Sequence, residues 1–224
     1  MLTPISVCSI LFVSLSLLPS QAATSGTFRL QVEGKDAGFE RFNSTADPGR
    51  ITLNSTSETR SGATARKVVT STEYRDNRPA RYSLEINSGN RVEKYLLMFT
   101  PSAVNISIEV NGRKTERTRP AGKEIVLLDR DVWHHYQILL ARYDLKSLGK
   151  QRFRVFIPQA TFREYNAEVE YKGITNVKVG EEKKQAYRYN IILADGFEVN
   201  AVADQTGRPF SIEVPAEKMK VVLE

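Results

Sequence analysis

The chain has 224 residues, of which 41% are hydrophobic and 26% charged, and its formal net charge is +6. These proportions supply enough apolar material for a core, which excludes wholesale disorder. The length suits one large β domain or two small sheet units that share a core. The positive charge favours acidic partners, but Lys and Arg are scattered singly, so we expect no nucleic-acid binding.

The N-terminus has the pattern of a signal peptide. Ile5 to Leu18 is an uncharged apolar run broken only by serines and Cys8, and small residues at Ser20 and Ala22 fit a signal-peptidase site. The run is short for a membrane span, which needs about 20 residues. We therefore predict that residues 1–22 are removed, with an uncleaved N-terminal anchor as the alternative. The mature chain would be periplasmic or secreted, without a cysteine and without a transmembrane segment.

The rest of the chain is dominated by residues that alternate between apolar and polar, which is the pattern of half-buried strands. Val104, Ile106, Ile108 and Val110, for example, are separated by polar residues, and similar runs occur at 28–32, 187–193, 210–214 and 219–223. Short turn sequences such as Asn111-Gly112 and Asp195-Gly196 separate the runs and force neighbouring strands to be antiparallel. We predict a mainly β protein, with curved antiparallel sheet forming an open barrel or a two-half clasp.

One segment departs from this pattern. At 100° per residue, six apolar side chains between 131 and 145 fall within an arc of about 120°: Val132, Trp133, Tyr136, Leu139, Leu140 and Tyr143. The spacing predicts one amphipathic helix of about four turns, with Asp129 or Asp131 as N-cap. His134 and His135 fall outside the apolar arc, so we expect them on the exposed face.

A weak internal similarity suggests two halves. Residues 78–86 and 208–214 both pass through Arg-Pro into an aromatic, Ser, aliphatic, Glu, aliphatic strand. We predict a single domain over 23–224 with two pseudo-repeated halves, about 24–128 and 150–224, joined by the helix at 131–145. Chance similarity is the alternative.

The order of these elements resembles a group of exported bacterial proteins known only as a domain of unknown function. The resemblance covers residues 26–223 and lies in the helix Asp-Val-Trp-His-His-Tyr-Gln-Ile-Leu-Leu, the strand Phe-Arg-Val-Phe-Ile-Pro, and the end Asp-Gln-Thr-Gly-Arg-Pro-Phe-Ser-Ile-Glu-Val-Pro. It implies a periplasmic setting and a clasp-like sheet around a central helix, somewhat like the lipoprotein-carrier folds of the cell envelope. It supplies no catalytic residues.

No catalytic, metal or cofactor site is assigned from the sequence. His134 and His135 are the only histidines, and as neighbours they are poorly placed to bind one ion. The chain has no Gly-x-Ser-x-Gly elbow and no Gly-rich phosphate loop. Paired carboxylates for glycoside chemistry stay open, because they would meet only in space; the available ones are Glu40, Asp76, Glu93, Asp129, Asp131 and Glu198.

Aromatic residues are the better indication of a ligand. Tyrosines along a curved sheet can line a groove for an apolar molecule, and core packing is the alternative. The candidate ligand-binding residues are Trp133, Tyr136, Tyr143, Tyr82, Tyr187 and Tyr189. We expect an exported, non-enzymatic envelope protein that binds an apolar or anionic amphipathic ligand or a protein partner. The alternatives are a hydrolase acting on envelope glycans or lipids, and an assembly factor that offers edge strands to a client.

Overall fold

A computed structural model describes residues 22–61, 64–159, 162–193 and 196–224. The first eight strands are β1 (Ala22–Val32), β2 (Lys35–Asp47), β3 (Arg50–Ser61), β4 (Thr64–Arg75), β5 (Arg78–Ser88), β6 (Arg91–Phe99), β7 (Ala103–Val110) and β8 (Arg113–Pro120). They are followed by β9 (Ile125–Leu127), a 3₁₀ turn (Trp133–His135), α1 (Tyr136–Ala141), β10 (Lys150–Ile157), β11 (Arg163–Val179), β12 (Glu182–Leu193), β13 (Glu198–Ala203), β14 (Pro209–Val214), a second 3₁₀ turn (Pro215–Glu217) and β15 (Met219–Leu223).

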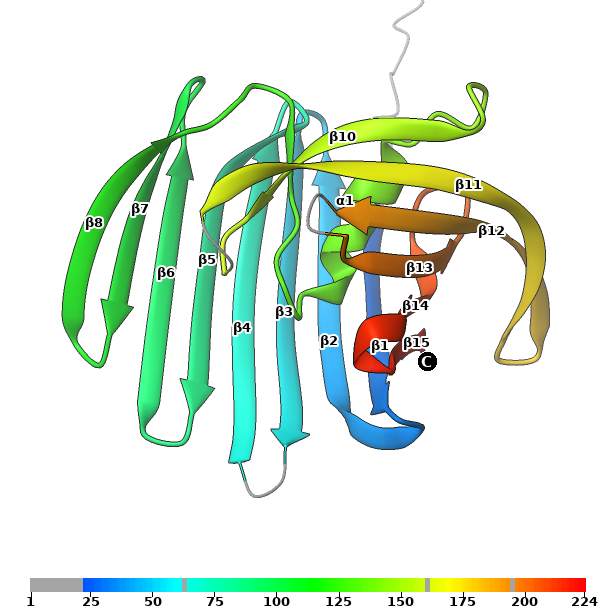
Figure 1. The fold of residues 1–224 in the computed structure, drawn as a ribbon, viewed down its shortest axis with the longest axis horizontal. Helices are drawn as coiled ribbons and strands as arrows, with labels where there is room; N and C mark the ends of the chain where they lie inside the picture. Colours follow the sequence, from blue (N-terminus) through cyan, green and yellow to red (C-terminus); the bar gives the residue numbers. More distant parts are fainter. Residues whose placement is uncertain (1–21, 62–63, 160–161, 194–195) are drawn as a thin grey trace, which may run out of the picture.

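All of these strands belong to one sheet, in the order β8-β7-β6-β5-β4-β3-β2-β1-β15-β14-β13-β12-β11-β10-β9. Every pairing is antiparallel except that of β9 with β10. The strands at the two ends of this order, β8 and β9, are joined by residues 121–124 alone, and such a link reaches about 17 Å at most. The sheet must therefore curl until its ends approach each other, and it does so without closing (Figure 1).

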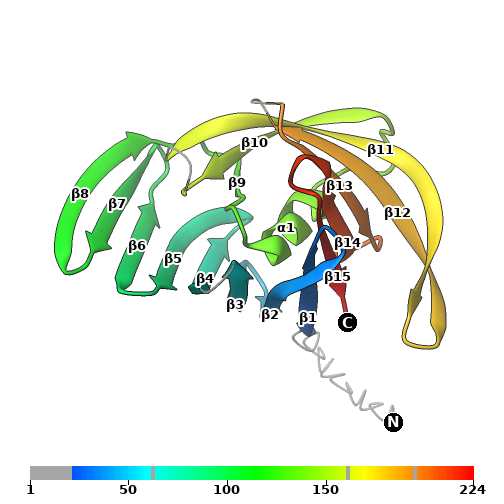
Figure 2. The same cartoon turned by 60° about the horizontal axis from the view of Figure 1, so that its bottom comes forward.

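The curled sheet has two layers with α1 between them. Strands β2 to β5 form one layer, and β10 to β13 cross over the other side of the helix (Figure 2). The predicted fold class, a mainly β protein with a curved antiparallel sheet around one amphipathic helix, is confirmed. The hairpin signals also act as expected: both residues of the Asn111-Gly112 turn have positive φ, 49° and 81°, as a two-residue hairpin requires.

The helix is shorter than predicted. The sequence predicts about four turns over 131–145, whereas α1 has 6 residues after a 3₁₀ turn of 3 residues. Asp131 has φ of 60°, which is incompatible with a right-handed helix. The N-cap positions are Val132 for the 3₁₀ turn and His135 for α1, so neither Asp129 nor Asp131 is the N-cap. The apolar stripe itself is buried as expected, and its members are 0–6% exposed.

The two histidines do not lie on an exposed face, so that prediction is wrong. His134 and His135 are both 0% exposed. The reason is the second layer: because sheet covers the helical segment on both sides, its polar face is enclosed as well as its apolar face (Figure 2). Buried imidazoles need hydrogen-bond partners, and β2 and β4 supply one to each ring: Glu40 lies against His134 Nδ1, and Thr72 lies against His135 Nε2.

The N-terminal predictions fall largely outside the described residues. Residues 1–21 hold nearly all of the predicted signal peptide, including Cys8, and Asp195 of one predicted turn is also outside them. Within the described part of the chain, no helix is long and apolar enough to cross a membrane. The internal duplication and the division into halves stay predictions.

Candidate ligand-binding groove

A buried carboxylate of β2 holds the start of the helical segment. Glu40 lies on the inward face of its strand with Phe42 and is 0% exposed. Its Oε2 accepts hydrogen bonds from the backbone N–H groups of Trp133 (2.9 Å) and His134 (3.3 Å), and its Oε1 lies 2.7 Å from His134 Nδ1. An acceptor from another strand thus does the work of an N-cap.

Asp129 forms the second anchor, beside the first. Its Oδ2 accepts a hydrogen bond of 2.5 Å from the Tyr82 hydroxyl of β5. Its Oδ1 accepts from the backbone N–H groups of Arg130 (2.9 Å) and Gln159 (3.0 Å). Burial raises the pKa of the Asp129 carboxyl to about 6, although these hydrogen bonds act to lower it.

His135, in its neutral form, connects the helical segment to β4. The backbone N–H of Asp129 donates to His135 Nδ1 at 3.3 Å, which leaves the ring proton on Nε2, 2.9 Å from Thr72 Oγ1 of β4. Burial, with a smaller effect from His134, lowers the pKa of His135 well below its ordinary value. These hydrogen bonds hold the helical segment against β2, β4 and β5. We call the cluster that forms them, Glu40, Thr72, Tyr82, Asp129, His134 and His135, the lock.

A groove lies beside the C-terminal end of α1. A cavity of about 920 Å³ lies between β3, β4, the end of α1 and β10, which is within the size range of small-molecule sites. Its apolar side chains are Ile51, Tyr74, Ile138 and Phe153. Its charged side chains are Arg78, Lys123, Arg142, Arg152 and Arg154, with Asp76 and Glu124.

The arginines of the groove are held in different ways. Arg142 is half-buried at the end of α1 and donates to the carbonyl oxygens of Ile125 (3.3 Å) and Asn77; burial lowers its pKa. Arg154 forms an ion pair with Glu164, whereas the side chain of Arg152 is 81% exposed. With five cationic side chains and two acidic ones, the groove has a basic rim above an apolar floor.

The structure separates the six predicted ligand-binding residues into three places. Trp133 and Tyr136 stack with ring centroids 6.3 Å apart and line a small cavity of about 120 Å³. Tyr82 is fully buried at Asp129. The remaining three, Tyr143, Tyr187 and Tyr189, gather with Tyr171 around β11 and β12.

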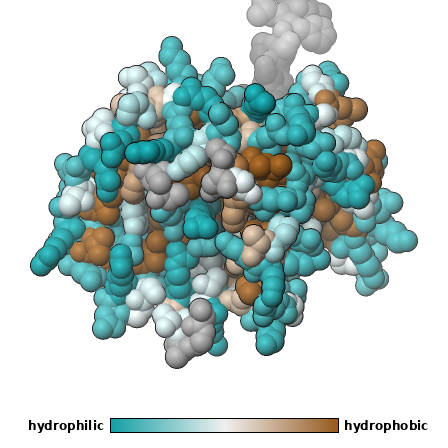
Figure 3. Space-filling view, in the orientation of Figure 1, coloured by the Kyte–Doolittle hydropathy of each residue, from teal (hydrophilic) through white to brown (hydrophobic). Residues whose placement is uncertain are grey.

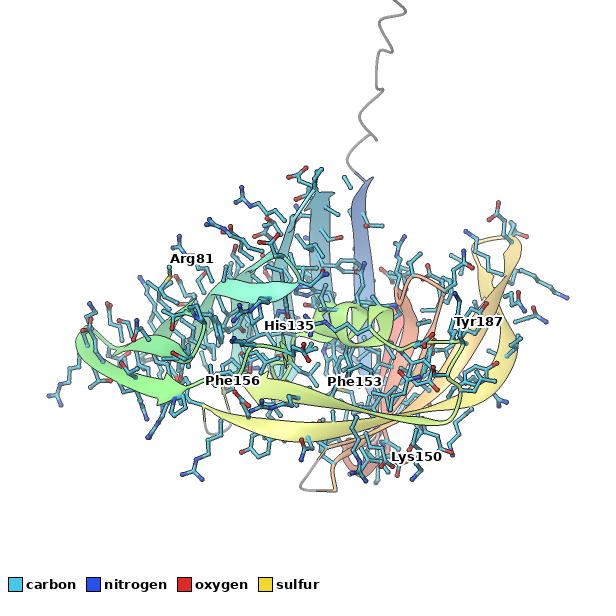
Figure 4. All side chains as sticks on the ribbon, turned by 90° about the horizontal axis from the view of Figure 1, so that it is seen from above. Arg81, His135, Lys150, Phe153, Phe156 and Tyr187 are labelled. Atoms are coloured by element: carbon cyan, nitrogen blue, oxygen red, sulfur yellow. The ribbon has the colours of Figure 1, made fainter. Side chains whose placement is uncertain are left out.

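None of the six lines the basic groove. Tyr187 lies on β12, toward the β11–β12 hairpin and away from His135, while Phe153 lies on β10 near the helix (Figure 4). Sequence reasoning missed the groove because its walls come from segments far apart in the chain. The one local signal is Arg152-Phe153-Arg154, where two cations flank an aromatic residue on a strand.

Three of the six carboxylates considered for glycoside chemistry are bound to other groups of the protein, and a fourth, Asp76, lines the basic groove. Glu40 and Asp129 are occupied in the buried lock, and Asp131 pairs with Arg66 at 2.7 Å. Among the described residues, no three His, Cys, Asp or Glu side chains come together as a metal site would require.

Fold and site together define a class: an open, curved, mostly antiparallel sheet that encloses one short helix and has a basic groove. No protein-family model matches the chain, and no curated protein matches it. The crystal structure of a DUF1089 family protein from Pseudomonas aeruginosa is similar, with 9% sequence identity and a TM-score of 0.47, covering 76% of this chain and 87% of that chain. A likeness this distant carries no argument about function.

The raised pKa of Asp129 predicts a pH-dependent effect of Asp129→Asn. The folded carboxyl titrates near 6 and an unfolded one near 4, so its contribution to stability is full below pH 4 and is lost as the pH rises through 6. Asparagine stays neutral and keeps an oxygen for the two backbone N–H groups. Urea unfolding measures the free energy of unfolding of both proteins. The value for the variant, relative to the wild type, should rise by roughly 2–3 kcal/mol between pH 4 and pH 7.

Asp144→Asn is the matched control. Hydrogen bonds from Ser147 and the Lys146 N–H lower the pKa of Asp144, so that variant should be less stable than the wild type at pH 7, and the difference should vanish in acid. A stability difference for Asp129→Asn that is the same at every pH would contradict the assignment.

Proposed function

We propose that this protein is a non-enzymatic binding protein of the bacterial cell envelope, periplasmic or secreted, which holds an anionic amphipathic molecule in the basic groove. The observation that carries the proposal is the composition of the groove, with cations at its rim and apolar side chains in its floor. A ligand with an acidic head and an alkyl or aromatic tail matches both parts.

The head group would lie against the arginines. Guanidinium groups bind carboxylate and phosphate through paired hydrogen bonds, and they hold their charge at any physiological pH. Arg152 lines the groove with its side chain 81% exposed, and its Nε lies 3.8 Å from Glu168 Oε2. Because the side chain is this exposed, an incoming acid can reach its guanidinium group. Long-range attraction of this kind is sensitive to salt.

The tail would lie on the floor. Ile51 of β3, Ile138 of α1 and Phe153 of β10 come from three elements around one cavity, and covering apolar surface contributes about 25 cal/mol per Å². The position of α1 determines the shape of the groove, because Ile138 of the floor lies in α1 and Arg142 of the rim follows its last residue. A hydrolase gains less support, since Glu40 and Asp129 are hydrogen-bonded inside the lock and Asp131 is ion-paired with Arg66.

Export is the second part of the proposal and is supported by the uncharged run from Ile5 to Leu18 before Ala22. N-terminal sequencing of protein recovered from the periplasm tests it. A chain that begins at Ala23 is expected, and a chain that keeps Met1 would refute export with cleavage.

Binding is tested with 11-(dansylamino)undecanoic acid, a fluorescent fatty acid, and with its methyl ester. The acid should bind with enhanced fluorescence and the uncharged ester about tenfold more weakly, because one charge-assisted contact is worth about 1.4 kcal/mol or more. Arg152→Gln should weaken binding of the acid and leave the ester unchanged. Phe153→Ser should weaken both.

Lys184→Gln is the matched control, since Lys184 is an exposed cation of β12 that pairs with Glu182 away from the groove. It should bind the acid as the wild type does. Equal loss of binding in Lys184→Gln and Arg152→Gln would mean that only net charge matters, and the groove would then not be the site. Absence of binding in the wild type would also overturn the proposal.

A further inference from the structure

We propose that β8 is a docking edge, to which an extended acidic segment of a partner protein adds as a further strand. This inference is independent of the groove, because no residue of β8 lines it. Three features of β8 support it: its open edge, the backbone groups it presents, and its charge.

The first feature is an uncovered edge. β8 stands at one end of the strand order and pairs with β7 alone, and all eight of its residues are exposed. In Figure 1 no other element lies along its outer side. The strand at the other end, β9, has only 3 residues and all are buried. Eight residues extend for roughly 26 Å, which is long enough to template another strand.

The second feature is the backbone. The two-residue turn at Asn111-Gly112 makes Val110 and Arg113 a pair, and the register continues in step to the end of the strand. In such a hairpin the closing pair is hydrogen-bonded and the pairs then alternate. The positions between the bonded ones, Lys114, Glu116 and Thr118, therefore turn their N–H and C=O groups toward the open edge.

The third feature is charge of one sign. β8 carries Arg113, Lys114, Arg117 and Arg119 against one acid, Glu116. A second copy of the same edge would bring these cations against each other, and like charges directly opposite are destabilising. Charged edges protect native sheets from self-association. The same charges attract a strand of the opposite sign.

The face on which the arginines lie specifies the pattern of the partner. Arg113, Arg117 and Arg119 are paired in register with Val110, Ile106 and Val104, so they share the inward face of the sheet. A strand added beside β8 would place every second side chain next to this row. The expected partner segment therefore has acidic residues at alternate positions, separated by residues that favour strands, such as Val and Thr.

The probe is a labelled octapeptide that alternates Glu with Val or Thr, and the control peptide has Lys in place of each Glu. Fluorescence anisotropy should show binding of the acidic peptide to the full chain, weakening with added salt, and little binding of the basic one. Amide chemical shifts of Lys114, Glu116 and Thr118 should change most. Equal binding of both peptides, or no binding, would overturn the proposal.

Glu116→Pro separates strand addition from charge attraction. Proline removes an N–H that faces the open edge and leaves the bonds to β7 intact. Glu116→Gln is the matched control, because it removes the same charge and keeps the N–H. The Gln variant should bind the acidic peptide at least as tightly as the wild type, and the Pro variant should bind it about tenfold or more weakly. Equal binding by the two variants would show charge attraction alone.

A second measurement avoids any change to the protein. The acidic peptide with N-methyl groups on alternate residues keeps its charge and loses the N–H groups that a ladder needs. It should fail to bind the wild type in one of its two methylation registers and retain binding in the other. Retained affinity in both registers would rule out strand addition.

Discussion

The fold depends on the buried carboxylate of Glu40. A charge that is 0% exposed is costly unless its lone pairs are satisfied, and here two backbone N–H groups and the His134 ring satisfy them. Through these bonds β2 fixes the position of a helical segment that is too short to be stable by itself. Removing the acceptor would leave two buried backbone N–H groups without a partner, at a cost of about 1–3 kcal/mol for each.

The position of the helix determines how much space is left inside the curved sheet. Leu139 and Leu140 are buried between the layers, and Gly207 lies so close that a Cβ there would be 2.3 Å from the backbone N of Ala141. Space for a ligand is then left where α1 ends, beside Ile138 and Arg142. The outside of the molecule, in the view of Figure 3, is mainly hydrophilic with separate hydrophobic patches.

Local patterns predicted several of the strands, although not β8, whose eight residues show no apolar alternation. Alternation over 104–110 and the Asn111-Gly112 turn predict the β7–β8 hairpin, since both act over a few residues. The helical stripe was also correct in its buried members, but not in its length, because the positive φ of Asp131 and the early end at Ala141 are set by tertiary packing. The spacing of apolar residues shows which side of a helix is buried, but it does not show where tertiary packing ends the helix.

The site depends on long-range contacts, which the sequence does not reveal. His134 was predicted to be exposed because its partner, Glu40, lies 94 residues away. Glu40 does share an alternation with Phe42 and Ser44, but Phe39 is equally apolar, so the sequence does not say which face turns inward. The groove combines five short segments in the same way, and none of the six aromatic candidates lines it.

Hydrogen exchange of the Trp133 and His134 amides tests the central role of Glu40 most directly. In the wild type, both amides should exchange only when the whole protein unfolds, as the amides of the central strands do. In Glu40→Leu, which is similar in volume and has no acceptor, both should exchange far faster than the amides of β3 and β4. Unchanged protection of the two amides in that variant would contradict the account.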